Sequence, residues 1–397
     1  MDSTRYTKIV IVTEAILGQW YDGVSLLVRH FLEHLPPDVT CETWSLRPEK
    51  NSRIDGSRWN TRFLNRLPTV RADWLLRVAG IPVGEKRTVQ ANQELFDACQ
   101  GADAIFLFTS ADSVFSTAIL SRWPQKTILH LTDSGSVFAS RSGMWRHFIR
   151  QRLSEWKAAK AKPTAIVFVS AHDRDIFVRS TGSEASRVMA IPLGVDSDTF
   201  HPASPEDKPA DRPFTLLFTG VLDYAPNTEA ADYIVTSILP KLPEDVRVTI
   251  AGLNPPQALL DAAIADPRLY VTGPIPDIER VYREADLFIA PMFKGAGMQN
   301  KILQALSSGL PVLTTPICVL AFEKASDALV ACSGTDEFLD AISELRANTP
   351  KRLRLSTCAR DLILNYYSWE RRCSNLLALI PGSSDQRFAH GTATIQA

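Results

Sequence analysis

The stretch that decides the fold is DLFIAPMFKGAGMQNKILQALSSGLPV, which runs from Asp286 to Val312. Its first apolar residues, 287–290, predict a short buried strand. A loop with two glycines follows, and from residue 299 the apolar side chains recur at helical spacing. A strand, a glycine loop and a helix in succession form the repeating unit of Rossmann-like α/β domains.

The loop inside this stretch is a candidate ligand site. Gly295 and Gly297 would let a ligand approach the backbone closely, and the free N–H groups that open the next helix suit a diphosphate. Lys301 lies in the first helical turn and adds a positive charge, while Gln304 lies one turn from Asn300. Because Gly-x-Gly is a common pattern, the alternative is a plain strand–helix turn with a solvated lysine and no ligand.

Strand and helix patterns alternate through the rest of the chain. A proline-rich segment at 202–213 separates two such series, and within the first of them residues 47–90 are irregular and basic. The sequence therefore predicts an α/β fold with two doubly wound parallel-sheet domains, whose ligands bind at the carboxyl ends of the strands in the cleft between the domains. The expected strands are 8–13, 104–108, 127–131, 165–169, 214–219, 246–250, 269–272, 287–291 and 311–314, and the expected helices include 23–35, 112–122, 144–160, 227–239, 256–264, 277–284 and 299–308.

Composition bounds the class of protein. The chain has 397 residues, of which 45% are hydrophobic and 22% charged, with a formal net charge of −1. These values exclude disorder as the main state and predict two domains with full cores. The six cysteines are scattered without a CxxC pair, which predicts a reduced protein without a structural zinc site. The uncharged stretch 302–322 contains polar residues and two prolines, so we interpret it as soluble core and not as a membrane span.

The near-zero net charge hides an asymmetry. Residues 1–162 carry 22 basic and 16 acidic side chains, whereas the remainder carries 21 and 28. The basic residues concentrate in 44–90 and 141–162, interleaved with tryptophans and other apolar side chains. Such segments suit an anionic membrane surface or a lipid diphosphate. A solvated helix face is the alternative, and nucleic acid is a weaker one because no nucleic-acid module is recognisable.

Polar residues at two strand ends of the first half are further candidates for a functional site. His130 and Asp133 close one strand, and Asp133 is the better candidate for a group that faces a substrate. His130 lies in an apolar run, which is more typical of a core histidine, and Asp133 would also fit a helix N-cap. Tyr21, Asp22 and Gly23 form the exit of the first strand, where an acceptor or a phosphate could bind, although a simple turn is nearly as good a reading.

Taken together and in order, these motifs resemble those of glycosyltransferase-B-fold (GT-B) enzymes, in the large family 4 of retaining, nucleotide-sugar-dependent transferases (glycosyl transferases group 1). The likeness covers most of the chain after residue 125. It rests on the stretch 286–312 together with Gly23-Val24, IPLGVD at 191–196, FTGVLDYAPN at 218–227, GPIPD at 273–277 and YSWE at 367–370.

The resemblance implies an organisation and an activity. An acceptor-side domain would cover 1–204, a nucleotide-sugar donor domain 205–360, a closing helix 361–380 that returns to the first domain, and a disordered tail 381–397. The activity would be transfer of a sugar from a nucleotide diphosphate sugar to a hydroxyl acceptor, with retention and without a metal or other cofactor, in polysaccharide or glycan biosynthesis.

The resemblance also implies site residues. Family members usually carry glutamates where this chain has Ala296 and Gln304. The second glutamate would accept bonds from both ribose hydroxyls, whereas Gln304 has one carbonyl acceptor and an amide donor. Asp133 or His130 would face the reacting sugar, with Tyr21, Asp22 and Gly23 on the acceptor side. The implied donor-binding residues are Gly220, Asn227, Ile275 near the base, Gly295, Ala296, Gly297, Met298, Asn300, Lys301 and Gln304.

The expected partners are a nucleotide sugar and a glycan or lipid-linked acceptor, with peripheral contact to an anionic membrane through the basic first half and no nucleic acid. A cytoplasmic location at the inner membrane face is expected. Ala296 and Gln304 leave two rivals open, a non-catalytic nucleotide-sugar-binding protein and a nucleotide-sugar epimerase on the same fold. A nicotinamide dehydrogenase is disfavoured, because the loop after the first strand lacks the Gly-x-Gly-x-x-Gly fingerprint.

Overall fold

The computed structural model describes residues 7–14, 23–46, 60–64, 85–132, 134–136, 139, 145–204, 212–294, 298–322 and 328–382. The chain forms two compact units: Met1–Pro192 together with Trp369–Ala397 make the first, and Leu193–Ser368 make the second. The division falls at Pro192 and not at the expected residue 204. The segment after Pro192 belongs to the second unit because Phe200 packs edge-on against Tyr282, and the carbonyl of Phe200 accepts a hydrogen bond from Ser307 Oγ at 2.6 Å.

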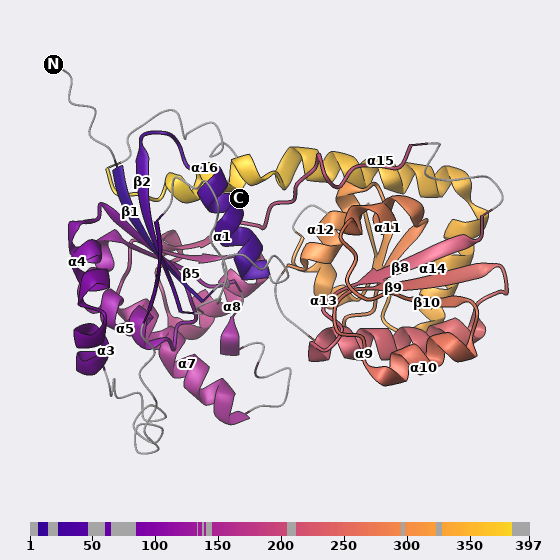
Figure 1. The fold of residues 1–397 in the computed structure, drawn as a ribbon, viewed down its shortest axis with the longest axis horizontal. Helices are drawn as coiled ribbons and strands as arrows, with labels where there is room; N and C mark the ends of the chain where they lie inside the picture. Colours follow the sequence, from indigo (N-terminus) through magenta and orange to yellow (C-terminus); the bar gives the residue numbers. More distant parts are fainter. Residues whose placement is uncertain are drawn as a thin grey trace. The chain divides into compact units, whose positions relative to one another are not determined.

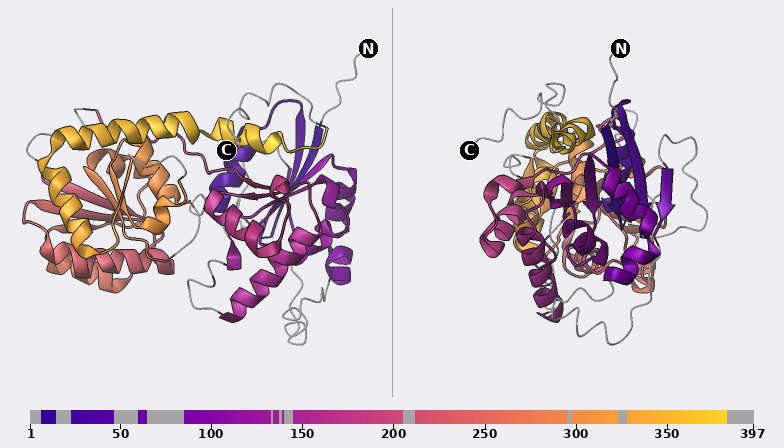
Figure 2. Two further views of the ribbon diagram at one scale, coloured as in Figure 1. Left: turned by 180° about the vertical axis from the view of Figure 1, so that it is seen from behind. Right: turned by 90° about the vertical axis from the view of Figure 1, so that its left-hand side faces the viewer.

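The first unit is a seven-stranded sheet with helices on both faces (Figures 1 and 2). The strand order is β3-β2-β1-β4-β5-β6-β7, and every pairing between its described strands is parallel. Its elements are β1 Thr7–Thr13, α1 Gly23–Glu33, β2 Val39–Ser45, β3 Asn60–Phe63, α3 Glu85–Ala91, α4 Gln93–Gly101, β4 Ala104–Phe108, α5 Val114–Leu120, η1 Pro124–Lys126, β5 Thr127–His130, α7 Trp145–Lys160, β6 Ala165–Phe168, α8 Ala171–Thr181, η2 Ala185–Arg187, β7 Val188–Ala190 and α16 Trp369–Leu377.

Two apolar layers hold this sheet. Val10 and Val12 of β1 face a core formed with α4, α5, α7 and α8, whereas Ile9 and Ile11 face a core formed with α1 and α16. A parallel strand that is covered on both faces reads as a continuous apolar run, which is why 8–13 could be predicted from sequence. The last helix, α16, therefore packs on the first unit, as the predicted GT-B fold requires.

The second unit is a six-stranded parallel sheet in the order β10-β9-β8-β11-β12-β13. Helices α9 and α10 cover one face and α11 and α12 the other, and α15 packs on α12 and α14 (Figure 1). Its elements are β8 Phe214–Thr219, α9 Ala225–Tyr233, η4 Ile234–Ile238, η5 Leu239–Lys241, β9 Val246–Ala251, α10 Gln257–Ala265, β10 Leu269–Val271, α11 Ile278–Glu284, β11 Leu287–Ala290, α12 Asn300–Ser307, β12 Val312–Thr314, α13 Pro316–Val319, β13 Leu329–Ala331, α14 Thr335–Ala347 and α15 Thr349–Tyr366.

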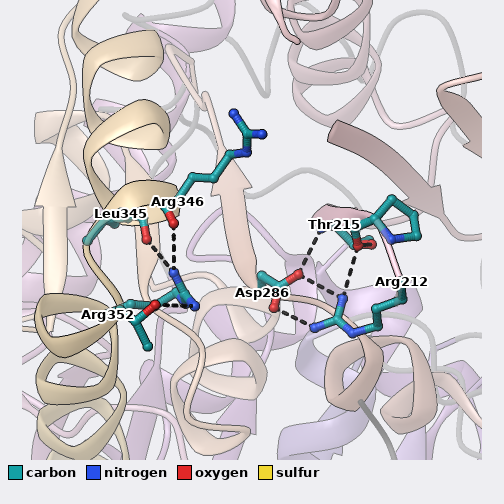
Figure 3. A network of polar contacts seen from close by, with 8 residues as sticks. Arg212, Thr215, Asp286, Leu345, Arg346 and Arg352 are labelled. Carbon is teal, nitrogen blue, oxygen red and sulfur yellow. Dashed lines mark hydrogen bonds and ion pairs between the residues drawn. The ribbon is translucent and has the colours of Figure 1, made fainter. Parts of the chain in front are cut away.

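Asp286, the first residue of the deciding stretch, fixes β11 against β8. Its carboxylate accepts two bonds from the Arg212 guanidinium, at 2.7 and 2.5 Å, and one from the Thr215 backbone N–H at 2.9 Å (Figure 3). A bidentate, charge-assisted pair is geometrically specific. It therefore sets the alignment of the two strands whose far ends carry the glycine loops.

Several elements differ from expectation. The strands over 104–108 and 214–219 and the helix start at Gly23 are confirmed. Residues 361–380 are not one closing helix, because α15 ends at Tyr366 in the second unit and α16 begins at Trp369 in the first. Residues 47–90 are expected to be irregular, yet they include β3 and the start of α3.

The segment 302–322 forms α12, β12 and α13 as interpreted. Within the described ranges no helix combines the length and the apolar character of a membrane span. Residues 383–397, which include most of the predicted disordered tail, lie outside the described residues.

Candidate functional site

The strand order of the second sheet places a candidate site at the ends of β8 and β11. The order reverses between these neighbours, so the connections that leave them run to opposite sides of the sheet. A crevice at the carboxyl ends of such strands is the usual ligand site of doubly wound sheets. Gly220 follows β8, and the connection from β11 to α12 begins at residue 291. The strand ends that precede the two glycine loops of the sequence are therefore neighbours.

Lys301 is the central cation of this site. Its side chain is 9% exposed, and its Nζ donates a hydrogen bond to Asn227 Oδ1. Nζ also lies 4.6 Å from the centre of the Phe218 ring and 4.0 Å from Met292 Sδ. Burial lowers the pKa of the Lys301 ammonium from 10.5 to about 7. Because the side chain is buried, the alternative of a solvated lysine does not hold. Within the described ranges Nζ forms no ion pair with a carboxylate.

Two glycines bring backbone close to this lysine. A Cβ on Gly220 would lie 2.7 Å from Asn227 Nδ2 and 3.2 Å from Lys301 Nζ, so a larger residue would push into the pair. Gly252 follows β9 with φ +154°, and a Cβ there would lie 1.7 Å from the Gly220 carbonyl oxygen. Gly252 therefore requires glycine, whereas a larger residue at Gly220 would displace the Asn227 side chain. Gly220 was predicted as a site residue, whereas Gly252 was missed, because only the pairing of β8 with β9 reveals the close approach.

A chain of hydrogen bonds orients Gln304. Tyr282 Oη lies 2.6 Å from Thr219 Oγ1 and donates to Gln304 Oε1 at 2.9 Å. Tyr282 is fully buried, and burial raises the pKa of its phenol, so the hydroxyl keeps its proton. Because Tyr282 holds the Gln304 carbonyl in one orientation, the amide N–H groups of Gln304 are the donors that it can offer to a ligand. Sequence reasoning predicted Gln304 but assigned no role to Tyr282 or Thr219.

The structure describes only some of the remaining residues that were predicted to bind the donor. Asn300 is the first residue of α12, Met298 is buried just before it, and Ile275 is half-buried in the loop between β10 and α11. Gly295, Ala296 and Gly297 lie outside the described residues. No group of histidine, cysteine, aspartate or glutamate side chains in the described ranges is arranged to hold a metal ion, and all six cysteines are unpaired.

In the first unit, His130 ends β5 and is 2% exposed. Its Nε2 accepts a hydrogen bond from Arg372 Nη2 at 2.8 Å, and Arg372 also donates to the carbonyl groups of Ile191 and Pro192. Burial and the Arg372 charge together hold the pKa of His130 well below 6.5. This environment is that of a core histidine, the alternative that the apolar run had favoured, and it leaves no lone pair for base catalysis.

The other first-unit candidates are only partly described. Gly23 is the first residue of α1. Tyr21, Asp22 and Asp133 lie outside the described residues, so their proposed roles stay predictions. Nothing in the sequence pattern indicated Arg372, which reaches His130 from a position 242 residues away in the chain.

Two doubly wound parallel sheets in one chain, with a last helix that returns to the first of them, define the GT-B architecture. Residues 213–348 of the chain match the family described as glycosyl transferases group 1. The matched segment lies within the second unit and contains both Gly220 and Lys301.

Two individual relatives match part of the chain. The chain is 24% identical over 255 residues to a D-inositol 3-phosphate glycosyltransferase of Xylanimonas cellulosilytica, and 24% identical over 232 residues to a UDP-Gal:alpha-D-GlcNAc-diphosphoundecaprenol alpha-1,3-galactosyltransferase of Escherichia coli. These matches cover 58% and 54% of the chain and 59% of each relative's length. Among solved structures, sucrose-phosphate synthase of Thermosynechococcus elongatus matches with a TM-score of 0.75 and 16% identity over 94% of this chain and 98% of that one, which supports the fold.

Proposed function

We propose that the protein is a glycosyltransferase that moves a sugar from a nucleotide diphosphate sugar to a hydroxyl group of an acceptor. The observation that carries this proposal is the buried Lys301, held by Asn227 beside Gly220 at the reversal point of the second sheet, inside the family-matched segment. A buried cation that lacks a carboxylate partner in the described ranges suits a ligand that brings its own negative charge. A diphosphate supplies that charge.

In the proposed reaction, the bond between the anomeric carbon and the diphosphate oxygen breaks while the acceptor oxygen bonds to the same carbon. The hydroxyl proton passes to the departing diphosphate. Lys301 and the positive end of the α12 helix dipole meet the charge that develops on the diphosphate. We include retention of the anomeric configuration and independence of a metal in the proposal, on the support of the ordered motifs and of the lysine as a counter-charge.

The proposed acceptor is a glycan or a lipid-linked saccharide. The name of the Escherichia coli relative specifies a UDP-Gal donor and an alpha-D-GlcNAc-diphosphoundecaprenol acceptor, and it supports this class for the present chain. We therefore place the proposed activity in polysaccharide or glycan biosynthesis, at the cytoplasmic face of a membrane. The excess of basic over acidic side chains in residues 1–162 supports a peripheral contact with anionic lipid.

The proposal is tested by donor binding followed by transfer. A thermal-shift series with nucleoside diphosphates and their sugars should reveal one stabilising base, since a ligand at a hundred times its Kd adds about 2.7 kcal/mol of stability. Lys301→Ala should abolish that shift. Radiolabelled sugar should then pass to a lipid-linked or glycan acceptor. Binding without any turnover would favour the non-catalytic protein, and conversion of the donor sugar without an acceptor would favour the epimerase.

Tyr282→Phe is expected to weaken donor binding without removing it. The change deletes the hydroxyl that holds the Gln304 carbonyl, so the amide can turn and present the wrong group. One neutral hydrogen bond contributes about 1 kcal/mol, so the donor Kd should rise roughly fivefold, while the rate at saturating donor changes little. Calorimetric titration of the variant measures the effect. Tyr270→Phe alters an exposed tyrosine in the same unit and is the matched control. An unchanged Kd in the Tyr282 variant would exclude Gln304 orientation as a binding determinant.

A further inference from the structure

Helix α7 of the first unit carries an apolar stripe on its solvent side. Trp145, Ile149, Leu153 and Trp156 have the spacing i, i+4, i+8 and i+11, which places them on one helix face. The two tryptophans are 64% and 46% exposed, and Phe148 at the margin of the stripe is also exposed. Exposed tryptophans in a row along a helix are costly to leave in water, so this face indicates a partner.

The charged side chains of α7 that border this stripe are all positive. Arg146 and Lys160 lie over the rings of Trp145 and Trp156, at 5.6 Å in each case, and Lys157 is exposed between them. Arg150 at the edge of the stripe pairs with Asp112 at 2.8 Å. A mixed border of aromatic and basic side chains fits a surface that is apolar inside and anionic at its rim.

The single acidic residue of α7 faces the other way. Glu155 is buried, and its carboxylate accepts hydrogen bonds from Ser134 Oγ at 3.0 Å and from Ser136 Oγ at 2.7 Å. Gln151 and Ala158 are buried on the same side. The inner face is thus fixed to the first unit through the segment that follows β5, while the outer face carries no carboxylate of its own. Figures 1 and 2 show α7 at the outside of that unit.

We propose that the outer face of α7 docks the first unit onto an anionic phospholipid bilayer. The apolar stripe would enter the boundary between head groups and acyl chains, and the flanking lysine and arginine side chains would contact lipid phosphates. The helix has 16 residues and is therefore about 24 Å long, enough to lie in the interface with all four stripe residues engaged. The inference specifies the membrane contact included in the proposed function, and its test does not require an active enzyme.

The test is flotation of the full-length protein with vesicles, in the absence of any donor. Wild-type protein should bind vesicles of phosphatidylglycerol and phosphatidylcholine, should bind pure phosphatidylcholine much more weakly, and should be released by high salt. Trp145→Ser/Trp156→Ser and Lys157→Gln/Lys160→Gln should each lower the partition coefficient about tenfold or more. Because these side chains point to solvent, the circular dichroism and thermal unfolding of the variants should match wild type.

Matched controls use exposed residues of the second unit. Ile264→Ser/Leu353→Ser removes two exposed apolar side chains, and Lys241→Gln/Arg354→Gln removes two exposed charges; both should bind vesicles as wild type does. Wild-type protein that fails to bind anionic vesicles, or α7 variants that bind equally well, would overturn the proposal. Self-association that the tryptophan variant abolishes, without vesicle binding, would assign the stripe to a second copy of the chain. If the α7 variants still bind the nucleotide sugar donor, then membrane binding and donor binding are separate properties, and one can fail without the other.

Discussion

Lys301→Met should lower the rate of sugar transfer at least about a hundredfold and, at pH 7, should make the second unit more stable. The loss of rate follows if the ammonium meets the charge of the departing diphosphate, because a preorganised donor in a site of low dielectric contributes about two to three orders of magnitude. Methionine has a similar length and no charge, so the fold should persist.

The gain in stability has a separate origin. Lys301 is buried against Phe218 and Met292, with the Asn227 amide as its polar partner. Replacing a buried charge by an apolar side chain of similar volume is often stabilising, by about 1–4 kcal/mol. The pKa of Lys301 is about 7 in the folded chain and 10.5 as its ordinary value. At a pH between these two values, the unfolded chain carries a proton on this lysine that the folded chain lacks. The stability contributed by this group therefore rises with pH across that window.

Urea unfolding at several pH values separates the two effects. The advantage of Lys301→Met over wild type should be largest near pH 7 and should shrink toward pH 10. Lys241→Met, which alters an exposed lysine of the same unit, should change the free energy of unfolding by less than about 0.5 kcal/mol and leave its pH dependence as in wild type. Full turnover in Lys301→Met would remove the lysine from donor binding, and reduced stability at pH 7 would show that the fold favours its charged form.

The sequence predicted those parts of the site that follow from local pattern and sheet topology. Buried parallel strands appear as apolar runs, and consecutive strand–helix units imply a reversal point where two strand ends meet. It was the resemblance to GT-B enzymes that assigned Gly220, Asn227 and Lys301 to one site, although Asn227 and Lys301 are 74 residues apart. The structure adds that Lys301 is buried, which a position in a first helical turn does not indicate.

The parts that escaped prediction depend on long-range packing. Tyr282 is an ordinary apolar-face residue of α11 in the sequence pattern, and only the approach of α12 and β8 makes its hydroxyl a link between Thr219 and Gln304. The three-residue strands β7 and β13 are too short to show a period. His130 was correctly suspected of being a core residue, but its partner Arg372 lies on a C-terminal helix whose local pattern carries no sign of the contact.

The contact between Arg372 and His130 should make the first unit sensitive to acid. Arg372 is fully buried, and its recorded hydrogen-bond partners are neutral: two backbone carbonyl groups and the His130 imidazole. Burial lowers the pKa of the guanidinium to about 9, so it is charged at neutral pH. Protonation of His130 would remove the acceptor and place a second buried cation at hydrogen-bond distance from the first.

This arrangement fixes the sign of the pH dependence. The folded-state pKa of His130 lies well below its ordinary value of 6.5, first because of burial and then because of the Arg372 charge. Between these two pKa values the unfolded chain binds one proton more than the folded chain, so the free energy of unfolding falls as the pH falls through this window. The loss can reach about 1.4 kcal/mol for each pH unit below 6.5.

The variant that isolates this effect is His130→Gln. A glutamine oxygen can take the place of Nε2 as an acceptor for Arg372, and it does not titrate. Wild-type protein should lose about 1 kcal/mol more than the variant between pH 6.5 and pH 5.5, measured by urea unfolding with a probe in the first unit. His201→Gln changes an exposed histidine and should reproduce the wild-type profile. If the free energy of unfolding of His130→Gln falls with pH as much as that of wild type, then His130 is not the group that takes up a proton when the first unit unfolds.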